Sequence, residues 1–321
     1  EQGRLNSVAV DVAVLTNLSR DHLDYHHDMA TYAVAKKRLF DFVSVKTAVI
    51  NSADYFGQRL IAELANRDDI AVMSYSQKPA QSTLAAKDIE TSLKGLHFTL
   101  ISDTKSGQVQ SSVLGDFNID NLLATAGSLL AINLPFDEVV KAISQCNAIN
   151  GRMQKIGNDK QTTVVIDFAH TPDALEKALQ SLRHHMQAQG ELWCVFGCGG
   201  DRDTGKRPLM GASAEHYADQ VVLTADNPRS EDNQAIVTDI LSGMNHQENQ
   251  DKTHVEHDRK HAIAYAISQA KQQDVILVAG KGHEQYQEIA GVKHPFSDMK
   301  VVIEALADAN DAHSMSIGVN E

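Results

Sequence analysis

The stretch TVVIDFAHTPDALEKALQSL, residues 163–182, places an apolar run directly before an amphipathic segment. Residues 163–166 have the length and apolar character of a buried strand. Thr171 and Pro172 then mark the start of a helix, because threonine caps helices well and proline suits the first turn. The stretch therefore predicts a strand that is followed at once by a helix.

The same alternation continues through the second half of the chain. Apolar runs are followed by helical stretches, which in chain order are 163–166, 172–189, 192–196, 208–218, 221–224, 232–244, 259–272 and 275–279. Strand–helix alternation of this kind is typical of a parallel sheet with helices on both faces. We therefore predict an α/β fold with a doubly wound, Rossmann-like sheet in this half.

The first half is less regular. Its apolar runs are 8–16, 47–51, 71–75 and 96–101, and helices are expected at 116–131 and 135–146. Small polar residues at Asn150 and Gly151 separate the two halves. A chain of 321 residues is long enough for about two domains. We therefore predict domains at 1–149 and 150–321.

The charge balance argues against a nucleic-acid partner. Lys and Arg number 29 and Asp and Glu number 42, which leaves a net charge of −13. Such an acidic surface repels phosphate backbones, so an anionic ligand must be held by local donors. Three cysteines are too few for a disulfide framework. No apolar run has membrane length and no signal peptide opens the chain, so we expect no membrane insertion and a cytoplasmic location.

Each strand of the second half ends in a polar or glycine-rich cluster. The clusters are 167–170, 197–202, 226–229 and 280–284. In an open parallel sheet, ligands bind beyond the carboxyl ends of the strands. Four clusters at one edge therefore predict a ligand site there.

Side chains of two of these clusters predict the kind of ligand. Arg229 offers a planar fork for a carboxylate, and Pro228 stiffens the turn that directs it. Asn227 can donate and accept, and Glu284 suits an ammonium group. Asp226, Arg229 and Glu284 together resemble a receptor for a zwitterion. The combination favours an amino acid as the ligand. A surface network of salt bridges is the alternative reading.

Residues 200–207, GDRDTGKR, nearly match the phosphate-binding P-loop pattern. Arg207 stands where that pattern needs the Ser or Thr that holds magnesium, and Pro208 follows. We therefore reject this stretch as a nucleotide loop.

In the first half, one lysine lies on an apolar stripe. At 100° per residue Tyr32, Lys36, Leu39, Phe40 and Val43 fall within about an 80° arc of a helix. An inward ammonium group needs a partner or a changed pKa, unless only its stem is covered. Upstream, the segment 21–28 is rich in metal-ligand side chains and places His22 and His26 four residues apart. A polar loop is the alternative there.

Taken together, the motifs resemble the Mur ligases. They are TNLSRDHLDYH at 16–26, YAVAKK at 32–37, DFNIDNLL at 116–123, GRM at 151–153, DFAHTPDAL at 167–175, FGCGGDRDTGKRP at 196–208, DNPR at 226–229 and GKGHE at 280–284. The resemblance covers nearly the whole chain. DNPR with GKGHE is specific within the family, and the arginine of DNPR favours diaminopimelate over lysine as the added residue.

The resemblance implies an activity. ATP phosphorylates a carboxylate of UDP-MurNAc-L-Ala-D-Glu, and an amine of meso-diaminopimelate attacks the acyl phosphate in a step of peptidoglycan precursor synthesis. It also implies the remainder of a P-loop-type central ATPase domain at 1–149, followed by an amino-acid-binding domain at 150–321. Magnesium is the implied metal, and we expect a monomer.

The resemblance also implies roles for individual residues. Lys36, carbamylated, and His22 are matched to magnesium. Asn118 and Asn121 are matched to the adenine of ATP, Asp167 to its ribose and Arg152 to its phosphates. Gln2 and Arg4 are matched to the UDP-MurNAc-dipeptide. The implied diaminopimelate pocket consists of Arg202, Asp226, Asn227, Pro228, Arg229, Gly280 and Glu284, with the arginine of DNPR at the distal carboxylate that lysine lacks.

The chain departs from the family pattern at its start. It begins at Glu1 without methionine and reads as the later part of a longer protein. The family's UDP-binding domain, its ATP-binding P-loop and a magnesium-binding glutamate belong upstream, so we expect this chain alone not to turn over substrate.

Other functions remain open at this stage. A metal-dependent hydrolase built on His22, His26 and Lys36 leaves DNPR without a role. A non-catalytic amino-acid-binding module is another, and a ligase of the folylpolyglutamate synthetase type has no evident need for DNPR.

Overall fold

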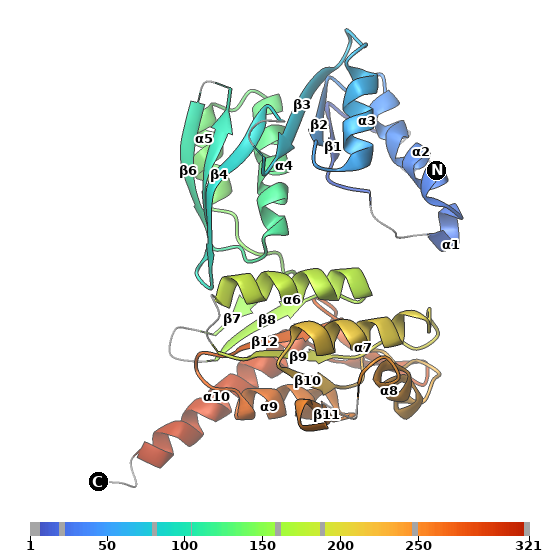
Figure 1. The fold of residues 1–321 in the computed structure, drawn as a ribbon, viewed down its shortest axis with the longest axis vertical. Helices are drawn as coiled ribbons and strands as arrows, with labels where there is room; N and C mark the ends of the chain where they lie inside the picture. The colour runs from blue at the N-terminus through green and yellow to red at the C-terminus, as the bar shows by residue number, and fades with distance from the viewer. Residues whose placement is uncertain are drawn as a thin grey trace. The chain divides into compact units, whose positions relative to one another are not determined.

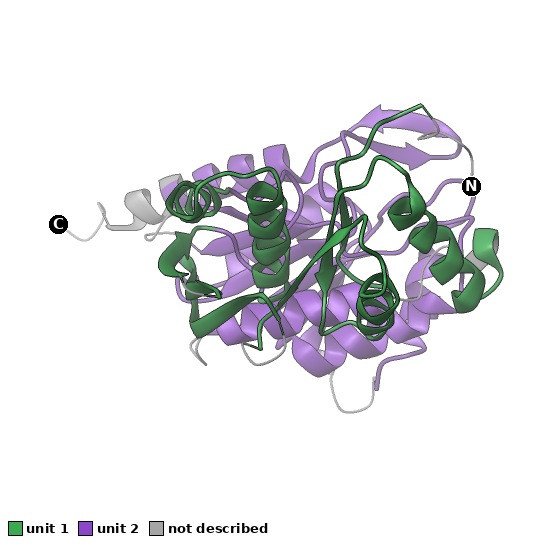
Figure 2. Ribbon diagram, turned by 90° about the horizontal axis from the view of Figure 1, so that it is seen from above, with its two compact units in different colours: residues 1–91, 95–112, 116–146 green, residues 92–94, 113–115, 147–321 purple. Residues whose placement is uncertain are grey.

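The computed structural model describes residues 7–18, 23–78, 82–103, 105–157, 162–186, 190–245 and 250–317 (Figure 1). The chain divides into two compact units, which Figure 2 distinguishes by colour. Unit 1 consists of residues 1–91, 95–112 and 116–146, and unit 2 of residues 92–94, 113–115 and 147–321. The predicted α/β class is confirmed, because parallel strands and helices alternate along the chain.

Unit 1 contains a six-stranded sheet whose strands follow chain order. They are β1 Val12–Leu15, β2 Thr47–Asn51, β3 Ala71–Ser76, β4 Leu84–Ser92, β5 Gly95–Ser102 and β6 Lys105–Ser111. The first four strands pair in parallel and the β5–β6 hairpin is antiparallel. The helices are α1 Leu23–His26, α2 Met29–Lys37, the 3-10 helix η1 Arg38–Asp41, α3 Tyr55–Leu64, α4 Phe117–Ala131 and α5 Phe136–Ser144.

Two apolar clusters cover the faces of this sheet. Phe40 and the α3 residues Leu60 and Leu64 pack with β1 and β2 in one cluster. Residues of α4 and α5 pack with β3 to β6 in the other. Asp54 begins α3 as its N-cap, because its carboxylate accepts from the Gly57 amide at 2.9 Å. The cap leaves α3 in place beside the end of β2.

The predicted stripe through Lys36 is wrong at one end. Val43 is fully exposed, although Phe40 is buried as the stripe requires. The reason is that α2 ends at Lys37 and continues as the 3-10 helix η1, after which Phe42 is extended. A 3-10 helix has three residues per turn, so the 100° spacing no longer applies beyond residue 37. Lys36 keeps its place on the last turn of α2, half-buried.

Unit 2 contains the predicted doubly wound sheet, in the order β11-β10-β9-β12-β8-β7. The strands are β7 Gln154–Ile156, β8 Thr163–Asp167, β9 Leu192–Phe196, β10 Gln220–Leu223, β11 Thr253–Val255 and β12 Val275–Ala279. All pairs are parallel except β7 with β8. A separate hairpin, β13 Tyr286–Ile289 with β14 Val292–Pro295, follows β12.

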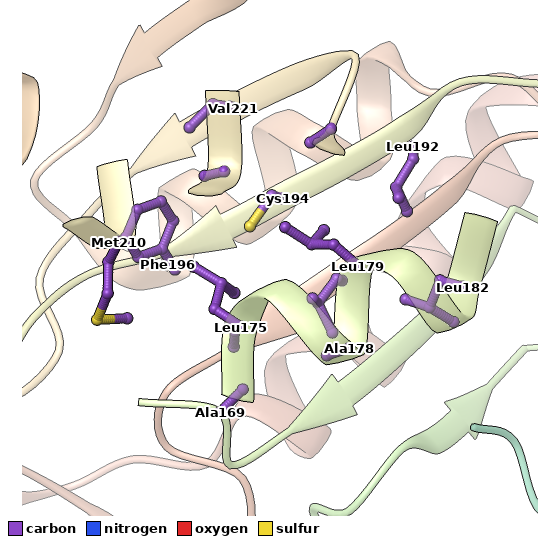
Figure 3. Packing of buried hydrophobic residues seen from close by; sticks show 14 of the residues in the cluster. Ala169, Leu175, Ala178, Leu179, Leu182, Leu192, Cys194, Phe196, Met210 and Val221 are labelled. Carbon is purple, nitrogen blue, oxygen red and sulfur yellow. The ribbon is translucent and has the colours of Figure 1, made fainter. Parts of the chain in front are cut away.

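Helices cover both faces of this sheet, as the alternation predicts. They are α6 Pro172–Met186, α7 Lys206–Tyr217, α8 Asn233–Leu241, α9 Arg259–Gln269 and α10 Asp298–Ile317, with the short 3-10 helix η3 Gln250–Lys252. Helices α6, α7 and α8 pack in one cluster, in which α6 lies against Cys194 and Phe196 of β9 (Figure 3). Helices α9 and α10 pack against the other face. None of the helices in the described part of the chain is both long enough and apolar enough to cross a bilayer.

Candidate functional site

The four polar clusters of unit 2 meet at one edge of the sheet. Each follows a strand of the parallel set β8, β9, β10 and β12, whose carboxyl ends lie side by side. Arg259, fully buried at the start of α9, joins two of these ends by donating to the carbonyls of Ala279 at 2.9 Å and Ala225 at 3.5 Å. Asp298 holds the same guanidinium with bonds of 2.7 and 2.8 Å. Arg259 therefore connects the chain just after β10 with the end of β12, next to the loops that carry the polar clusters.

Asn227 lies at the centre of the site. Its Oδ1 accepts from the Lys281 ammonium group at 3.0 Å and from the Glu288 amide at 2.9 Å. Its Nδ2 donates to Glu284 Oε2 at 2.9 Å, and Lys281 Nζ reaches the same oxygen at 2.9 Å. Two of the predicted residues, Asn227 and Glu284, are therefore in direct contact.

The charge on Glu284 is stabilised by this network. Burial raises the pKa of its carboxyl, but hydrogen bonds from Asn227 and Lys281, with the nearby charges of Lys281 and Arg229, outweigh burial and hold the pKa below its ordinary value. A carboxylate in this state can receive an ammonium group at neutral pH.

Asp226 and Gly280 are in close contact across the edge. A Cβ added to Gly280, whose φ is +112°, would lie 2.5 Å from Asp226 Oδ2, so only glycine leaves room for this carboxyl. Asp226 Oδ2 is buried and has no hydrogen-bond partner among the described residues. Burial raises the pKa of Asp226, although the charges of Arg259 and Lys281 oppose the rise. A buried oxygen without a partner is unusual in a folded protein, and a ligand donor would satisfy it.

Arg229 is held from both sides by backbone and side-chain contacts. Its φ is +52°, and its amide donates to the Glu288 carbonyl at 3.0 Å. Its guanidinium donates to the Gly200 carbonyl at 2.7 Å through Nη1 and lies 3.5 Å from Glu288 Oε2 through Nε. The Pro228 carbonyl lies so near Gly200 that a Cβ there would come within 2.0 Å of it. The loops after β9 and β10 are therefore closely fitted, as a directed guanidinium needs.

Arg202 is more exposed than the other predicted pocket residues. Its Nη1 reaches the Asp201 carbonyl at 3.5 Å, and its side chain is exposed. A Cβ on Gly199 would meet Arg229 Nη1 at 2.9 Å and Arg202 Cγ at 3.8 Å. The edge therefore presents two neighbouring cations and two acids, which suits a zwitterion with an additional carboxylate.

The stretch that resembles a P-loop has a different use. Arg207 is buried and pairs with Glu231 at 2.8 Å and Asp239 at 2.9 Å. Glu231 also accepts from the Asp201 amide at 2.5 Å. The arginine that departs from the P-loop pattern thus ties α7 to the loop after β10 and to α8.

A second group of predicted residues surrounds the end of β8. Both oxygens of Asp167 accept backbone amides, from Met153 at 2.7 Å and Ala169 at 2.8 Å. Burial raises the pKa of Asp167, and these bonds oppose the rise. The guanidinium of Arg152 lies over the ring of Phe168 at 4.7 Å. Arg152 is exposed there, so its charge is available to an anion.

In unit 1, Lys36 lies beside the loop that follows β1. Its Nζ donates to the Asn17 carbonyl at 3.1 Å and lies 5.1 Å from the centre of the Tyr32 ring. Among the described side chains, no carboxylate pairs with it. Lys37, by contrast, pairs with Glu63 at 2.9 Å.

The two asparagines predicted near adenine are neighbours on α4. Asn121 donates to Asn118 Oδ1 at 2.7 Å on the first turns of the helix. Gln77, at the end of β3, donates to Asp120 Oδ2 at 3.2 Å and to the Asp116 carbonyl at 3.3 Å. Burial raises the pKa of Asp120, and the bond from Gln77 opposes the rise. A polar group thus lies where α4 meets the sheet.

Three predicted residues, Gln2, Arg4 and His22, lie outside the described residues. Within the ranges that the structure describes, no group of three or more His, Cys, Asp or Glu side chains is arranged to hold a metal ion. Lys36 in its free form is a donor and does not fit a cation, whereas its carbamate would offer oxygen ligands.

Sequence reasoning missed four charged residues that organise the edge. Lys281, Arg259 and Asp298 are buried, and Glu288 is partly exposed. Lys281 alone carried a signal, because it stands between two glycines within the predicted cluster 280–284. Arg259 and Asp298 lie outside all the clusters, and nothing in their spacing points to the site.

Comparison with known protein families finds two matches. Residues 1–129 match the Mur ligase middle domain, and residues 151–282 match the Mur ligase glutamate ligase domain. A curated UDP-N-acetylmuramoyl-L-alanyl-D-glutamate–2,6-diaminopimelate ligase from Chromobacterium violaceum is 47% identical over 306 residues. The match covers 95% of this chain and 61% of that protein, so this chain spans about three fifths of the relative's length.

Solved structures of Mur ligases are also similar to this chain. A structure titled with the same enzyme name has a TM-score of 0.69 at 41% identity and covers 96% of this chain and 62% of that one. A MurF ligase from Thermotoga maritima, in complex with ADP, has a TM-score of 0.67 at 15% identity and shows the same fold. It covers 96% of this chain and 64% of that one.

Proposed function

This chain belongs to the Mur ligase family, and from that membership we propose that it forms part of an ATP-dependent ligase. The proposed reaction joins meso-diaminopimelate to UDP-MurNAc-L-Ala-D-Glu in the synthesis of peptidoglycan precursors. The observation that carries the proposal is the contact between the loops 226–229 and 280–284, within a chain 47% identical to a ligase of that name. Residues 1–149 are then the central ATP-binding part and 150–321 the amino-acid-binding domain.

The amino-acid pocket is proposed at the edge of the unit 2 sheet. Arg229, with Arg202 beside it, receives the distal carboxylate, and Glu284 receives an ammonium group. Asn227 sets the position of Glu284 through its amide, while Asp226 offers its unpartnered oxygen across Gly280. Pro228 stiffens the turn before Arg229. Holding the amine in one orientation increases its rate of attack on an acyl phosphate.

The nucleotide and the peptide acceptor are assigned to the remaining predicted residues. Asn118 and Asn121 are proposed for the adenine, Asp167 for the ribose and Arg152 for the phosphates. Gln2 and Arg4, outside the described residues, are proposed for the UDP-MurNAc-dipeptide. We propose that the protein acts in the cytoplasm as a monomer.

Magnesium is proposed to bind beside Lys36 in carbamylated form, with His22 as a neighbour. When bound, the metal stabilises charge on the phosphates. Free Lys36 donates to the Asn17 carbonyl, so the lysine must lose this role when it becomes an anionic ligand.

Mass spectrometry tests the modification of Lys36 directly. At neutral pH, we expect the peptide that contains Lys36 to carry the added mass of one CO2, because no described carboxylate holds this amine as a cation. Lys37 is the matched control, since Glu63 pairs with it and favours the ammonium form. Absence of the adduct under conditions that preserve carbamates, or an equal adduct on Lys37, would contradict the proposal.

Calorimetry with the amino acid tests the proposed substrate. We expect this chain to bind meso-diaminopimelate at one site, and to bind lysine more weakly because lysine has no distal carboxylate for Arg229. Equal affinities for the two amino acids would refute the assigned pocket. A metal-dependent hydrolase has no reason to bind diaminopimelate at all.

A further inference from the structure

We propose that Lys281 is a positioning residue for the amino-acid pocket. Its buried ammonium group fixes the Asn227 amide and the Glu284 carboxylate in the arrangement that receives the ammonium group of the amino acid. This inference rests on the proposed function, because it deepens the same pocket.

The backbone around Lys281 directs its side chain inward. Gly280 and Gly282 both have positive φ, at +112° and +53°, so the chain turns sharply on either side of the lysine. A Cβ on Gly282 would lie 2.8 Å from Phe168 Cβ, which leaves no room for a larger residue. The Lys281 side chain is fully buried as a result.

The buried ammonium group is matched by specific partners. It donates to Asn227 Oδ1 at 3.0 Å and to Glu284 Oε2 at 2.9 Å, and it lies 5.8 Å from the centre of the Tyr286 ring. An unpaired ammonium group in this position would be strongly unfavourable. The lysine and its two acceptors therefore hold one another in place.

Lys281 also determines which way the Asn227 amide faces. Oδ1 is fixed by two donors, the Lys281 ammonium group and the Glu288 amide. With the oxygen fixed, Nδ2 must face Glu284, to which it donates at 2.9 Å. Reversal of this amide would set its NH2 group against two donors, and its oxygen against the Glu284 carboxylate oxygen.

Glu284 is anchored through one oxygen only. Oε2 accepts from Asn227 and Lys281, whereas Oε1 accepts no hydrogen bond from any residue that the structure describes. The side chain is 23% exposed, so Oε1 is open to a ligand. Lys281 thus secures the charge and one oxygen of Glu284, and leaves the other oxygen for the incoming ammonium group.

The charged groups around Glu284 make Lys281 its principal cation. Lys281 contacts the carboxylate directly, and Arg229 lies nearby while it also pairs with Glu288. Behind these groups, Asp226 adds negative charge, and Arg259 is engaged by Asp298. Loss of the Lys281 charge therefore leaves burial to dominate the ionisation of Glu284.

The Lys281→Met variant, which keeps the length of the side chain without its charge, tests the inference. Carboxyl NMR of the ligand-free chain is expected to show the Glu284 pKa below its ordinary value in the unaltered protein and above it in the variant. Affinity for meso-diaminopimelate is expected to fall about tenfold or more near neutral pH, with a further fall toward about pH 5 that the unaltered chain does not show. The matched control, Lys260→Met, removes a lysine whose exposed partner is Glu304 and should change neither property.

Two further measurements keep the inference testable if Lys281→Met fails to fold. In the unaltered chain, the Lys281 Nζ resonance is expected to move with the titration of Glu284. In a Glu284→Gln background, which removes the carboxylate, the second change Lys281→Met is expected to weaken binding much less than it does alone.

The possible outcomes separate this inference from the proposed function. One outcome is that the unaltered chain binds meso-diaminopimelate while Lys281→Met changes neither the pKa of Glu284 nor the pH dependence of binding. In that case this inference alone is wrong. If the unaltered chain binds no diaminopimelate, both are wrong. A change of stability without a change in the pKa of Glu284 would show that Lys281 only fills space.

Discussion

Replacement of Arg229 with alanine is expected to lower the affinity for meso-diaminopimelate to the level of lysine. The distal carboxylate would enter the site and find no guanidinium, and leaving one partner of such a charged pair alone costs about 2–5 kcal/mol. This corresponds to about a 30-fold loss or more. Calorimetry with both amino acids measures the effect.

Affinity for lysine provides the internal control for this variant. Lysine lacks the distal carboxylate, so its binding should change little when Arg229 is removed. The backbone of Arg229 has a φ of +52°, a conformation no easier for alanine than for arginine, so the fold itself should be little affected. An equal loss for both amino acids would show that Arg229 supports the loop rather than recognises the ligand.

Replacement of Asp298 with alanine is expected to produce the largest loss of stability. Arg259 and Asp298 are both fully buried and joined by bonds of 2.7 and 2.8 Å. Removal of the acid leaves the guanidinium buried without a counter-charge, which costs about 3–5 kcal/mol. The fluorescence of Trp193, the single tryptophan of the chain, follows the urea unfolding of unit 2 because it lies buried on β9.

The pair Lys260–Glu304 is the matched control for that experiment. It joins the same two helices at 3.0 Å, but both side chains are 59% exposed. An exposed pair contributes less than about 1 kcal/mol, so Glu304→Ala should change the unfolding midpoint only slightly. Similar losses for Asp298→Ala and Glu304→Ala would contradict the assigned importance of the buried pair.

The fold of unit 2 was largely predictable, because its buried strands are short apolar runs and its helices are amphipathic. The position of the ligand site was also predictable, because four of the strands end in a polar cluster at the carboxyl-terminal edge of the sheet. Strands β4, β6, β7 and β11, the β13–β14 hairpin and helices α3 and α10 were missed. Strand β6, KSGQVQS, is polar and mostly exposed, so it carries no apolar run from which to predict it.

The predicted site was incomplete for a different physical reason. Arg259 and Asp298 are 39 residues apart, and their pairing depends on α9 and α10 packing on one face of the sheet. A sequence pattern within one helix or strand cannot predict a contact between residues so far apart in the chain. Lys281 was present in the predicted cluster, but its burial follows from positive φ values at Gly280 and Gly282 that sequence alone did not reveal.

The error at Val43 shows how local geometry limits periodicity arguments. The stripe assumed one continuous α-helix from residue 32 to 43, whereas the chain changes to a 3-10 helix after Lys37. A change of only one turn was enough to leave Val43 in solvent.

A crystal of this chain soaked with meso-diaminopimelate tests the central claim most directly. We expect the distal carboxylate within hydrogen-bond distance of the Arg229 guanidinium and an ammonium group beside Glu284 Oε1. Diaminopimelate bound at any other place, or bound at this edge with its distal carboxylate away from the Arg229 guanidinium, would contradict the account.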